Sequence, residues 1–201
     1  MKEIDLKKNY SELTESASFE EIERIENCTG QFADDVLTAT VFKLGKKMFY
    51  AWLPLDEYFY ILDKEETKKA SQKPKEFLKK IIMDEILTYT GTEFHRYIEL
   101  IRWGIIPEPE EDSNFINNEE YFILQNSIFH GYDKWSFICK DKERPNCYST
   151  CDNDIDSPES FNFKEAENIK EKFETEDYYL GNNKAQRPLY FIISRTDIEE
   201  A

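Results

Sequence analysis

The side chains best suited to metal chemistry in this sequence are its four cysteines and two histidines. Cys139, Cys147 and Cys151 lie in one short segment, and His130 precedes them. Zinc takes thiolate and imidazole ligands in a tetrahedral site, so these four residues form a candidate structural zinc site. Their C-x7-C-x3-C spacing differs from the paired C-x2–4-C knuckle, however, and free thiols are the alternative. We favour free thiols and expect no cofactor.

A catalytic role for histidine would depend on His95 or His130, the only imidazoles in the chain. Glu99 follows His95 by one helical turn, but two candidate ligands are too few to hold a metal ion. The chain contains no G-x-S-x-G motif, no signature of a catalytic cysteine and no glycine-rich phosphate loop. These observations favour a protein without catalytic activity. The alternative is a small enzyme that acts on a nucleotide or RNA, with the basic stretch 64–80 holding the phosphate.

One acidic run resembles a calcium-binding loop at its start only. Residues 152–156 read Asp-Asn-Asp-Ile-Asp, as in the opening of an EF-hand. The sixth loop position is then Ser157 where glycine makes the sharp turn, and the twelfth is Phe163 where a bidentate glutamate belongs. We therefore expect a hydrated acidic loop at these residues.

The net charge of −16 is unevenly distributed along the chain. Residues 1–103 hold 16 basic and 20 acidic residues, whereas residues 104–201 hold 10 basic and 22 acidic ones. A field of this sign disfavours direct binding to nucleic acid or to an anionic membrane, and favours encounter with a basic protein surface. High net charge also keeps proteins soluble, and solubility alone is the alternative explanation.

Ten carboxylates in three segments of the second half are the candidate partner-binding groups. They are Glu108, Glu110, Glu111, Asp112, Asp152, Asp154, Asp156, Glu174, Glu176 and Asp177. Brought together on one face, they would present oxygens at spacings comparable with nucleic-acid phosphates. Such a face would fit a groove lined with Lys and Arg, in a complex weakened by salt. If the segments do not converge, they are hydrated loops and helix ends.

The leading hypothesis is a non-catalytic acidic binding protein or inhibitor that docks on a basic, nucleic-acid-handling protein such as a nuclease. Nucleic-acid mimics of mobile elements are the functional types that this size and charge fit, namely anti-restriction, anti-CRISPR and nuclease-immunity proteins. The first residues are polar, and nowhere do about 18 apolar residues run together. We therefore expect no signal peptide, no membrane contact and a cytoplasmic location.

In the first half of the chain, hydrophobic periodicity predicts a helix, three antiparallel strands and a helical pair. A capping-box spacing at Ser18 and Glu21 predicts a helix over 18–27. Runs of β-branched and aromatic residues predict strands over 35–44, 47–53 and 57–62. The helical pair covers about 74–103, with Pro74 in the first turn. Its second helix turns four residues inward: Phe94, Tyr97, Ile98 and Ile101.

In the second half, residues 107–113 read as an exposed, acidic, proline-containing loop. Strands are expected over 120–125, 135–140 and 188–194, the last apolar enough to lie inside a sheet. A helix over 163–174, capped by Asn162, should pack on that sheet. The predicted fold class is therefore α+β, with antiparallel sheets. We expect an N-terminal lobe (1–106) and a C-terminal lobe (114–201) joined by the loop, or a single compact domain.

Overall fold

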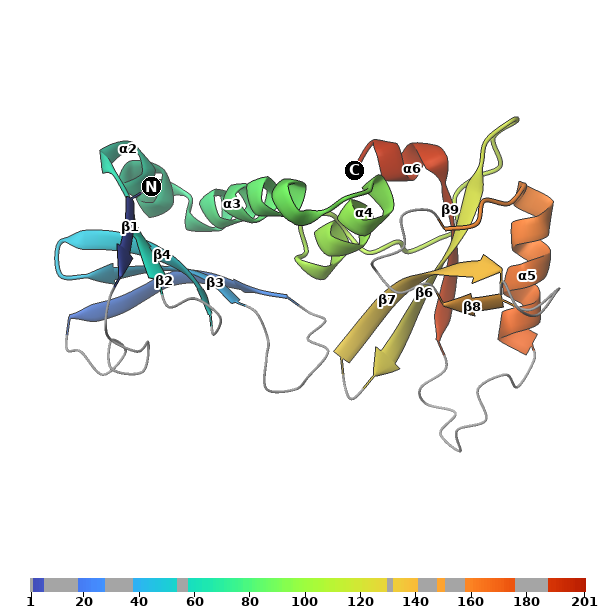
Figure 1. Ribbon diagram of the computed structural model, residues 1–201, viewed down its shortest axis with the longest axis horizontal. Helices are drawn as coiled ribbons and strands as arrows, with labels where there is room; N and C mark the ends of the chain where they lie inside the picture. The colour runs from blue at the N-terminus through green and yellow to red at the C-terminus, as the bar shows by residue number, and fades with distance from the viewer. Residues whose placement is uncertain are drawn as a thin grey trace. The chain divides into compact units, whose positions relative to one another are not determined.

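The computed structural model describes residues 2–5, 18–27, 38–53, 58–129, 132–140, 148–150, 158–175 and 188–201. The chain divides into two compact units, Met1–Thr88 and Tyr89–Ala201. Each unit combines an antiparallel sheet with helices, so the predicted α+β fold class is confirmed (Figure 1).

The first unit contains a five-stranded sheet in the order β1-β5-β4-β3-β2, with every neighbouring pair antiparallel. The predicted three-strand meander forms its centre, because β-branched and aromatic side chains suit a pleated, half-buried surface. Phe42, Phe49 and Phe59 are packed together in its core. The strands are β1 (Lys2–Asp5), β2 (Phe19–Glu26), β3 (Thr38–Leu44), β4 (Lys47–Leu53) and β5 (Tyr58–Ile61).

Strand β2 shows that the predicted helix over 18–27 is wrong. The ladder between β2 and β3 shifts register between Glu21 and Glu23, as at a β-bulge. One extra residue breaks the strict alternation of a strand and leaves apolar residues at a spacing that imitates a helical face. Phe19 stacks on Phe42 of β3 with ring centroids 5.3 Å apart. As an edge strand, β2 carries four glutamates and one arginine, which discourage pairing with another sheet.

Two helices complete the first unit. α2 (Lys64–Gln72) starts from a capping box in which the Asp63 side chain accepts two backbone N–H groups and Glu66 bonds back to Asp63 N. α3 (Pro74–Tyr89) starts at the proline, as predicted, because the first helical turn needs no N–H there. The fully buried side chains of α3 are Leu78, Ile82 and Ile86. In the described part of the chain, no helix is long and apolar enough to cross a bilayer.

The second unit contains a four-stranded antiparallel sheet in the order β8-β7-β6-β9. The central strands β6 (Tyr121–Phe129) and β7 (Tyr132–Lys140) are longer than the predicted 120–125 and 135–140. The outer strands are β8 (Tyr148–Thr150) and β9 (Leu189–Ser194).

Helices cover both faces of this sheet (Figure 1). On one face α4 (Glu93–Arg102) and the five-residue α6 (Arg195–Glu199) pack on alternate residues of β6, β7 and β9. All four residues predicted to point inward from α4 lie in that core. On the other face lies α5 (Phe163–Thr175), through Ala166 and Ile169. Its predicted cap is confirmed, with Asn162 Oδ1 accepting Glu165 N–H at 3.0 Å and Glu165 accepting Asn162 N–H at 3.2 Å.

The predicted loop 107–113 has no regular structure, but it is bound to the outer edge of β9. Strand β9 was expected inside a sheet and instead lies at an edge of the β8-β7-β6-β9 order. Asp112 Oδ1 accepts the N–H of Ile192 at 2.9 Å, and Ser113 N–H donates to the Ile192 carbonyl at 2.7 Å. Ser194 N–H donates to Ser113 Oγ at 3.0 Å. The loop therefore takes the place of a neighbouring strand.

The division between the units falls before α4, whereas the sequence placed the lobe boundary at 107–113. A boundary at 107–113 would separate α4 from a core in which it supplies four of the ten buried residues. Truncating one buried Ile or Phe side chain costs about 2–5 kcal/mol. Losing four is comparable with the whole stability of a domain, about 5–15 kcal/mol.

We therefore predict that residues 89–201 fold alone and that residues 107–201 do not. Urea unfolding of the two fragments, followed by tryptophan fluorescence and circular dichroism, measures this. Fragment 89–201 should give one cooperative transition, and fragment 107–201 should give none. Equal cooperativity in both fragments would show that α4 is dispensable for this core.

Candidate functional site

Two of the three predicted acidic segments meet at Lys170 on α5. Lys170 Nζ lies 2.8 and 2.6 Å from the two carboxylate oxygens of Asp112, and 3.8 Å from Glu174 Oε1. Asp112 is held against the sheet edge by Ile192, and Glu174 lies one helical turn beyond Lys170. The fold thus brings the segment 108–112 beside the end of α5.

Further exposed carboxylates surround this junction. Glu110 and Glu111 precede Asp112, while Glu167 and Glu171 lie with Glu174 on the side of α5 that carries Lys170, at four- and three-residue spacing. Within the described residues, the side chains of Glu110, Glu111, Glu167 and Glu171 form no ion pair or hydrogen bond. We call the following residues the acidic patch: Glu110, Glu111, Asp112, Glu167, Glu171 and Glu174.

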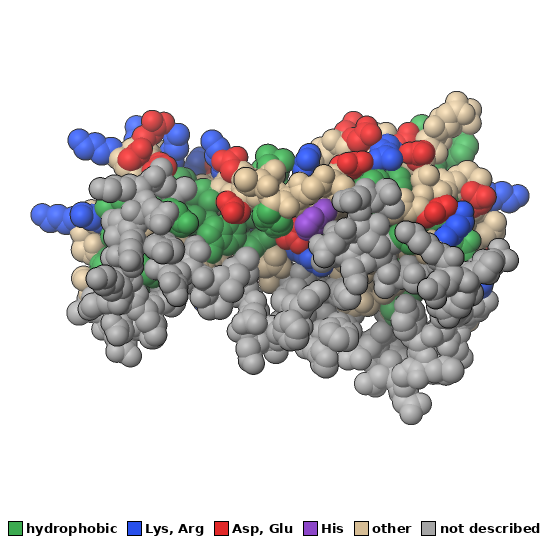
Figure 2. All heavy atoms as spheres, viewed as in Figure 1, with side chains coloured by type: hydrophobic (Ala, Val, Ile, Leu, Met, Phe, Trp, Pro, Cys, Tyr) green, Lys and Arg blue, Asp and Glu red, His purple; other side chains and the backbone are tan. Residues whose placement is uncertain are grey.

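The other predicted partner-binding carboxylates are Glu108 and five residues outside the described part of the chain. In the view of Figure 2, the coloured carboxylates are interspersed with Lys and Arg side chains. Glu108 is exposed on the same loop as Glu110. Five predicted partner-binding residues lie outside the described residues: Asp152, Asp154, Asp156, Glu176 and Asp177.

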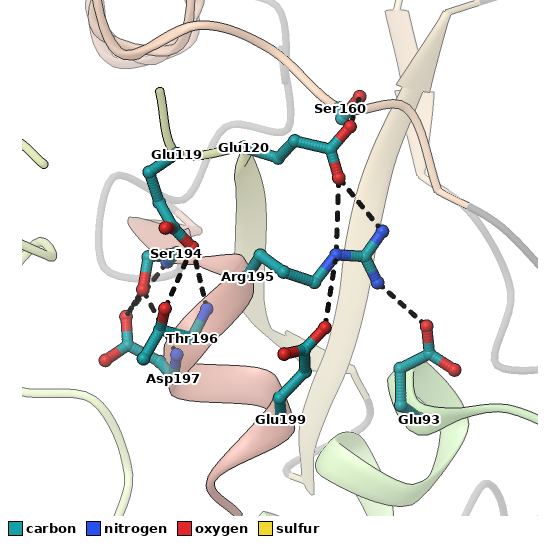
Figure 3. Close-up of polar contacts among 9 residues, drawn as sticks. All are labelled: Glu93, Glu119, Glu120, Ser160, Ser194, Arg195, Thr196, Asp197 and Glu199. Atoms are coloured by element: carbon teal, nitrogen blue, oxygen red, sulfur yellow. Dashed lines mark hydrogen bonds and ion pairs between the residues drawn. The ribbon is translucent and has the colours of Figure 1, made fainter. Parts of the chain in front are cut away.

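Among the described residues, Arg195 at the start of α6 forms the most connected ionic cluster (Figure 3). Its Nη1 lies 2.8 Å from Glu93, and its Nη2 and Nε lie 3.1 and 3.3 Å from Glu120. Glu199 is 3.9 Å from Nε. The guanidinium also lies over two rings, at 5.0 and 5.1 Å from the centroids of Phe94 and Phe122. Because all three nitrogens face carboxylates of this chain, the cluster fastens α6 to α4 and β6 and leaves little capacity for an external anion.

Asp197 organises the first turn of α6. Its carboxylate accepts hydrogen bonds from Ser194 N at 2.9 Å, from Ser194 Oγ at 2.6 Å and from Ser113 Oγ. Beside it, Glu119 accepts Thr196 N–H at 2.8 Å. Partial burial raises the pKa of Asp197, but the hydrogen bonds from Ser113 and Ser194 outweigh burial, so its pKa is below the ordinary value.

His95 lies against an aromatic ring rather than against Glu99, which follows it by one helical turn. The His95 and Tyr89 rings meet edge to face with centroids 5.9 Å apart. Glu99 is buried, and it accepts the Tyr89 hydroxyl at 2.8 Å and Arg102 Nη1 at 2.6 Å. Burial raises the pKa of Tyr89 far above its ordinary value, and the charge of Glu99 raises it further. Tyr89 is therefore a hydrogen-bond donor to Glu99 and cannot act as a base near neutral pH.

The remaining enzyme and zinc candidates are placed only in part. Cys139 on β7 is disulfide-bonded, so the expectation of four free thiols is wrong there, and its sulfur is not the thiolate that a zinc site requires. His130, Cys147 and Cys151 lie outside the described residues. Among the described residues, no three His, Cys, Asp or Glu side chains are grouped to hold a metal ion. The zinc alternative therefore lacks Cys139 as a ligand, and catalysis by His130 stays an untested alternative.

Sequence reasoning missed the two cations that organise the second unit. Lys170 lies in a helix with both signs of charge, and Arg195 follows an apolar strand, so neither stands out in the sequence. Capping spacing was a usable signal for α6, because Ser194 and Asp197 form a capping box.

We predict that Arg102→Leu lowers the free energy of unfolding by about 3–5 kcal/mol, since it leaves the Glu99 carboxylate buried without its cation. Urea unfolding should show that Glu99→Leu/Arg102→Leu recovers much of that loss. The matched control is Lys69→Leu in the exposed Lys69–Glu65 pair, which should change stability by less than about 0.5 kcal/mol. A double variant as unstable as Arg102→Leu would contradict the charge-pairing argument.

We also predict a pH-dependent contribution from Asp197. Because its pKa is lowered on folding, its stabilisation is present above the ordinary value of 3.8 and is lost as the pH falls below it. Asp197→Asn should lower stability at about pH 7 by an amount typical of a helix cap, about 0.5–2 kcal/mol. The difference from wild type should shrink below pH 3.8 in urea unfolding series. A difference that grows on acidification would show the opposite sign of linkage.

No protein-family model matches this chain, and no curated protein and no solved structure matches it significantly.

Proposed function

We propose that this chain is a non-catalytic acidic binding protein that docks through the acidic patch on a basic surface of a nucleic-acid-handling protein. The observation that carries the proposal is the convergence of two acidic segments at Lys170. Asp112 and Glu174 lie at one ammonium group, and the six carboxylates of the patch counted together with Lys170 have a net charge of −5.

The geometry favours a docking surface over a catalytic centre. Glu110, Glu111 and Glu171 are exposed, and their carboxylates are not neutralised within the described residues. By contrast, the carboxylates near His95 and Arg195 are already paired inside the unit. Unpaired charges are the ones that steer a partner of opposite sign toward the surface.

The sign and layout of the patch support the proposal of a nucleic-acid-handling partner. Proteins that bind nucleic acid carry Lys and Arg in grooves that contact phosphates. Carboxylates on a loop and on an adjacent helix can occupy such a groove in place of phosphates. Inhibition of a nuclease or of another defence enzyme, as by anti-restriction, anti-CRISPR or immunity proteins, is the activity we propose. A cytoplasmic location belongs to the same proposal, although the disulfide at Cys139 is more typical of an oxidising compartment.

The test is retention of a basic partner by the tagged full-length chain, eluted with increasing salt. We expect Glu110→Gln/Glu111→Gln to release the partner at lower salt, because each exposed ion pair contributes about 0.2–1 kcal/mol. The matched control is Asp84→Asn/Glu85→Gln, which removes the same charge from exposed positions of α3 in the first unit. Equal elution of the two variants would exclude the patch as the docking surface. Failure to retain any basic protein at low salt would exclude the proposed function.

A further inference from the structure

Two large apolar side chains project into solvent beside the acidic patch. Phe115 is 64% exposed and Ile116 is 48% exposed, in the segment between Ser113 and β6. Another exposed apolar residue of the described chain is Leu189, which begins β9, whereas Asp112 and Ser113 bond to residues near the end of that strand. Single exposed apolar residues are normal on a protein surface, whereas contiguous apolar exposure rimmed by polar residues marks interaction sites.

The backbone that presents these side chains is held in place. The buried Tyr121 hydroxyl accepts the N–H of Ile116 at 2.5 Å and lies 3.2 Å from the Asn114 carbonyl oxygen. Phe115 contacts the Phe163 ring, with centroids 5.6 Å apart, and Phe163 contacts Tyr121 at 5.0 Å. Asn118 adopts a left-handed backbone conformation with φ of 63° in the turn that follows.

Such a segment is already ordered before it binds. Asp112 and Ser113 fasten its start to β9, and Tyr121 fastens its middle. A partner therefore does not have to order the loop, and less of the binding free energy is lost to conformational entropy. Aromatic side chains, phenylalanine among them, are enriched in the cores of protein–protein interfaces.

Charge identifies the occupant. The stretch 104–120 contains six carboxylates and no Lys, Arg or His, and Glu110 and Glu111 in it are exposed and unpaired within the described residues. A second copy of this chain, with a net charge of −16, would bring like charges together at this loop. A surface with an apolar pocket surrounded by Lys and Arg complements both features.

We propose that Phe115 and Ile116 are the apolar anchors of the docking surface and insert into an apolar pocket of the basic partner while the acidic patch pairs with the surrounding Lys and Arg. This inference rests on the proposed function and adds the residues that give the complex its salt-resistant affinity. Charge pairing alone would be screened at high salt, whereas burial of the two side chains would not.

Two labelled probes separate the charge and apolar components: poly-lysine, and an amphipathic Lys/Leu peptide of equal charge. Fluorescence anisotropy with the full-length chain gives the Kd for each. Phe115→Ser/Ile116→Ser should raise the Kd for the Lys/Leu peptide at least about tenfold and leave that for poly-lysine within about twofold. Glu110→Gln/Glu111→Gln should raise the Kd for both peptides. Leu189→Ser, at a residue with 59% exposure, is the matched control and should change neither.

The single variant Ile116→Ser guards against a folding defect, because Tyr121 holds the backbone of Ile116 and not its side chain. Its urea unfolding midpoint should equal that of the wild type while its affinity for the Lys/Leu peptide falls. If neither peptide binds the wild type at low salt, the proposed function itself fails. Suppose that poly-lysine binds, but that the Kd for the Lys/Leu peptide is unchanged by Phe115→Ser/Ile116→Ser or is raised equally by Leu189→Ser. The anchor proposal alone is then overturned. A wild-type dimer that Phe115→Ser/Ile116→Ser dissociates, seen by light scattering, would also overturn it, in favour of a second copy.

Discussion

The second unit depends on how the open edge of β9 is hydrogen-bonded. An antiparallel edge strand turns every second residue's N–H and C=O away from its neighbour, and buried backbone groups need partners. On β9 the segment 112–113 satisfies three such groups: a carboxylate accepts the Ile192 N–H, a backbone amide donates to the Ile192 C=O, and a hydroxyl accepts the Ser194 N–H. Another β-strand could also satisfy these backbone groups, but it would not place a polar loop on the surface. The edge therefore fixes where the acidic loop lies.

Placing Asp112 at this edge has an electrostatic consequence for α5. The Asp112 carboxylate bonds to Ile192 N and to Lys170 together, so the helix is connected to the sheet edge through one side chain. Lys170 is a partly buried cation whose other neighbour is Glu174. The charge of Asp112 is largely neutralised within the unit by Lys170. Among the described residues, its neighbours Glu110 and Glu111 have no ionic partner, so their negative charge remains available to a binding partner. The same contact that stabilises the fold thus separates structural carboxylates from those available to a partner.

Local patterns predicted the regular elements well, and tertiary hydrogen bonding was beyond them. The apolar spacing of Phe94, Tyr97, Ile98 and Ile101 predicted the buried face of α4, because a 3.6-residue period leaves little freedom in choosing that face. The three-residue apolar spacing over Phe19–Glu26 led to the wrong prediction of a helix, because a β-bulge produces the same spacing in a strand. The acidic character of 107–113 was evident, but its anchoring was not, since Asp112 and Ser113 bond to backbone 80 residues away along the chain. Lys170, which joins two acidic segments, is one of many lysines in the sequence.

The apolar pair Phe115 and Ile116 is best understood together with that anchoring. A flexible loop with two exposed apolar side chains could fold them against its own sheet, which would bury area at a small entropic cost. Here the hydrogen bonds of Ile192 at one end and the Tyr121 hydroxyl at the other hold the backbone so that Phe115 reaches only the edge of Phe163. The hydrogen bonds of the loop thus outweigh the free energy that would be gained by burying the two side chains against the sheet. The exposed apolar area remains a cost to the isolated chain, and burial of Phe115 and Ile116 in the proposed complex would remove that cost.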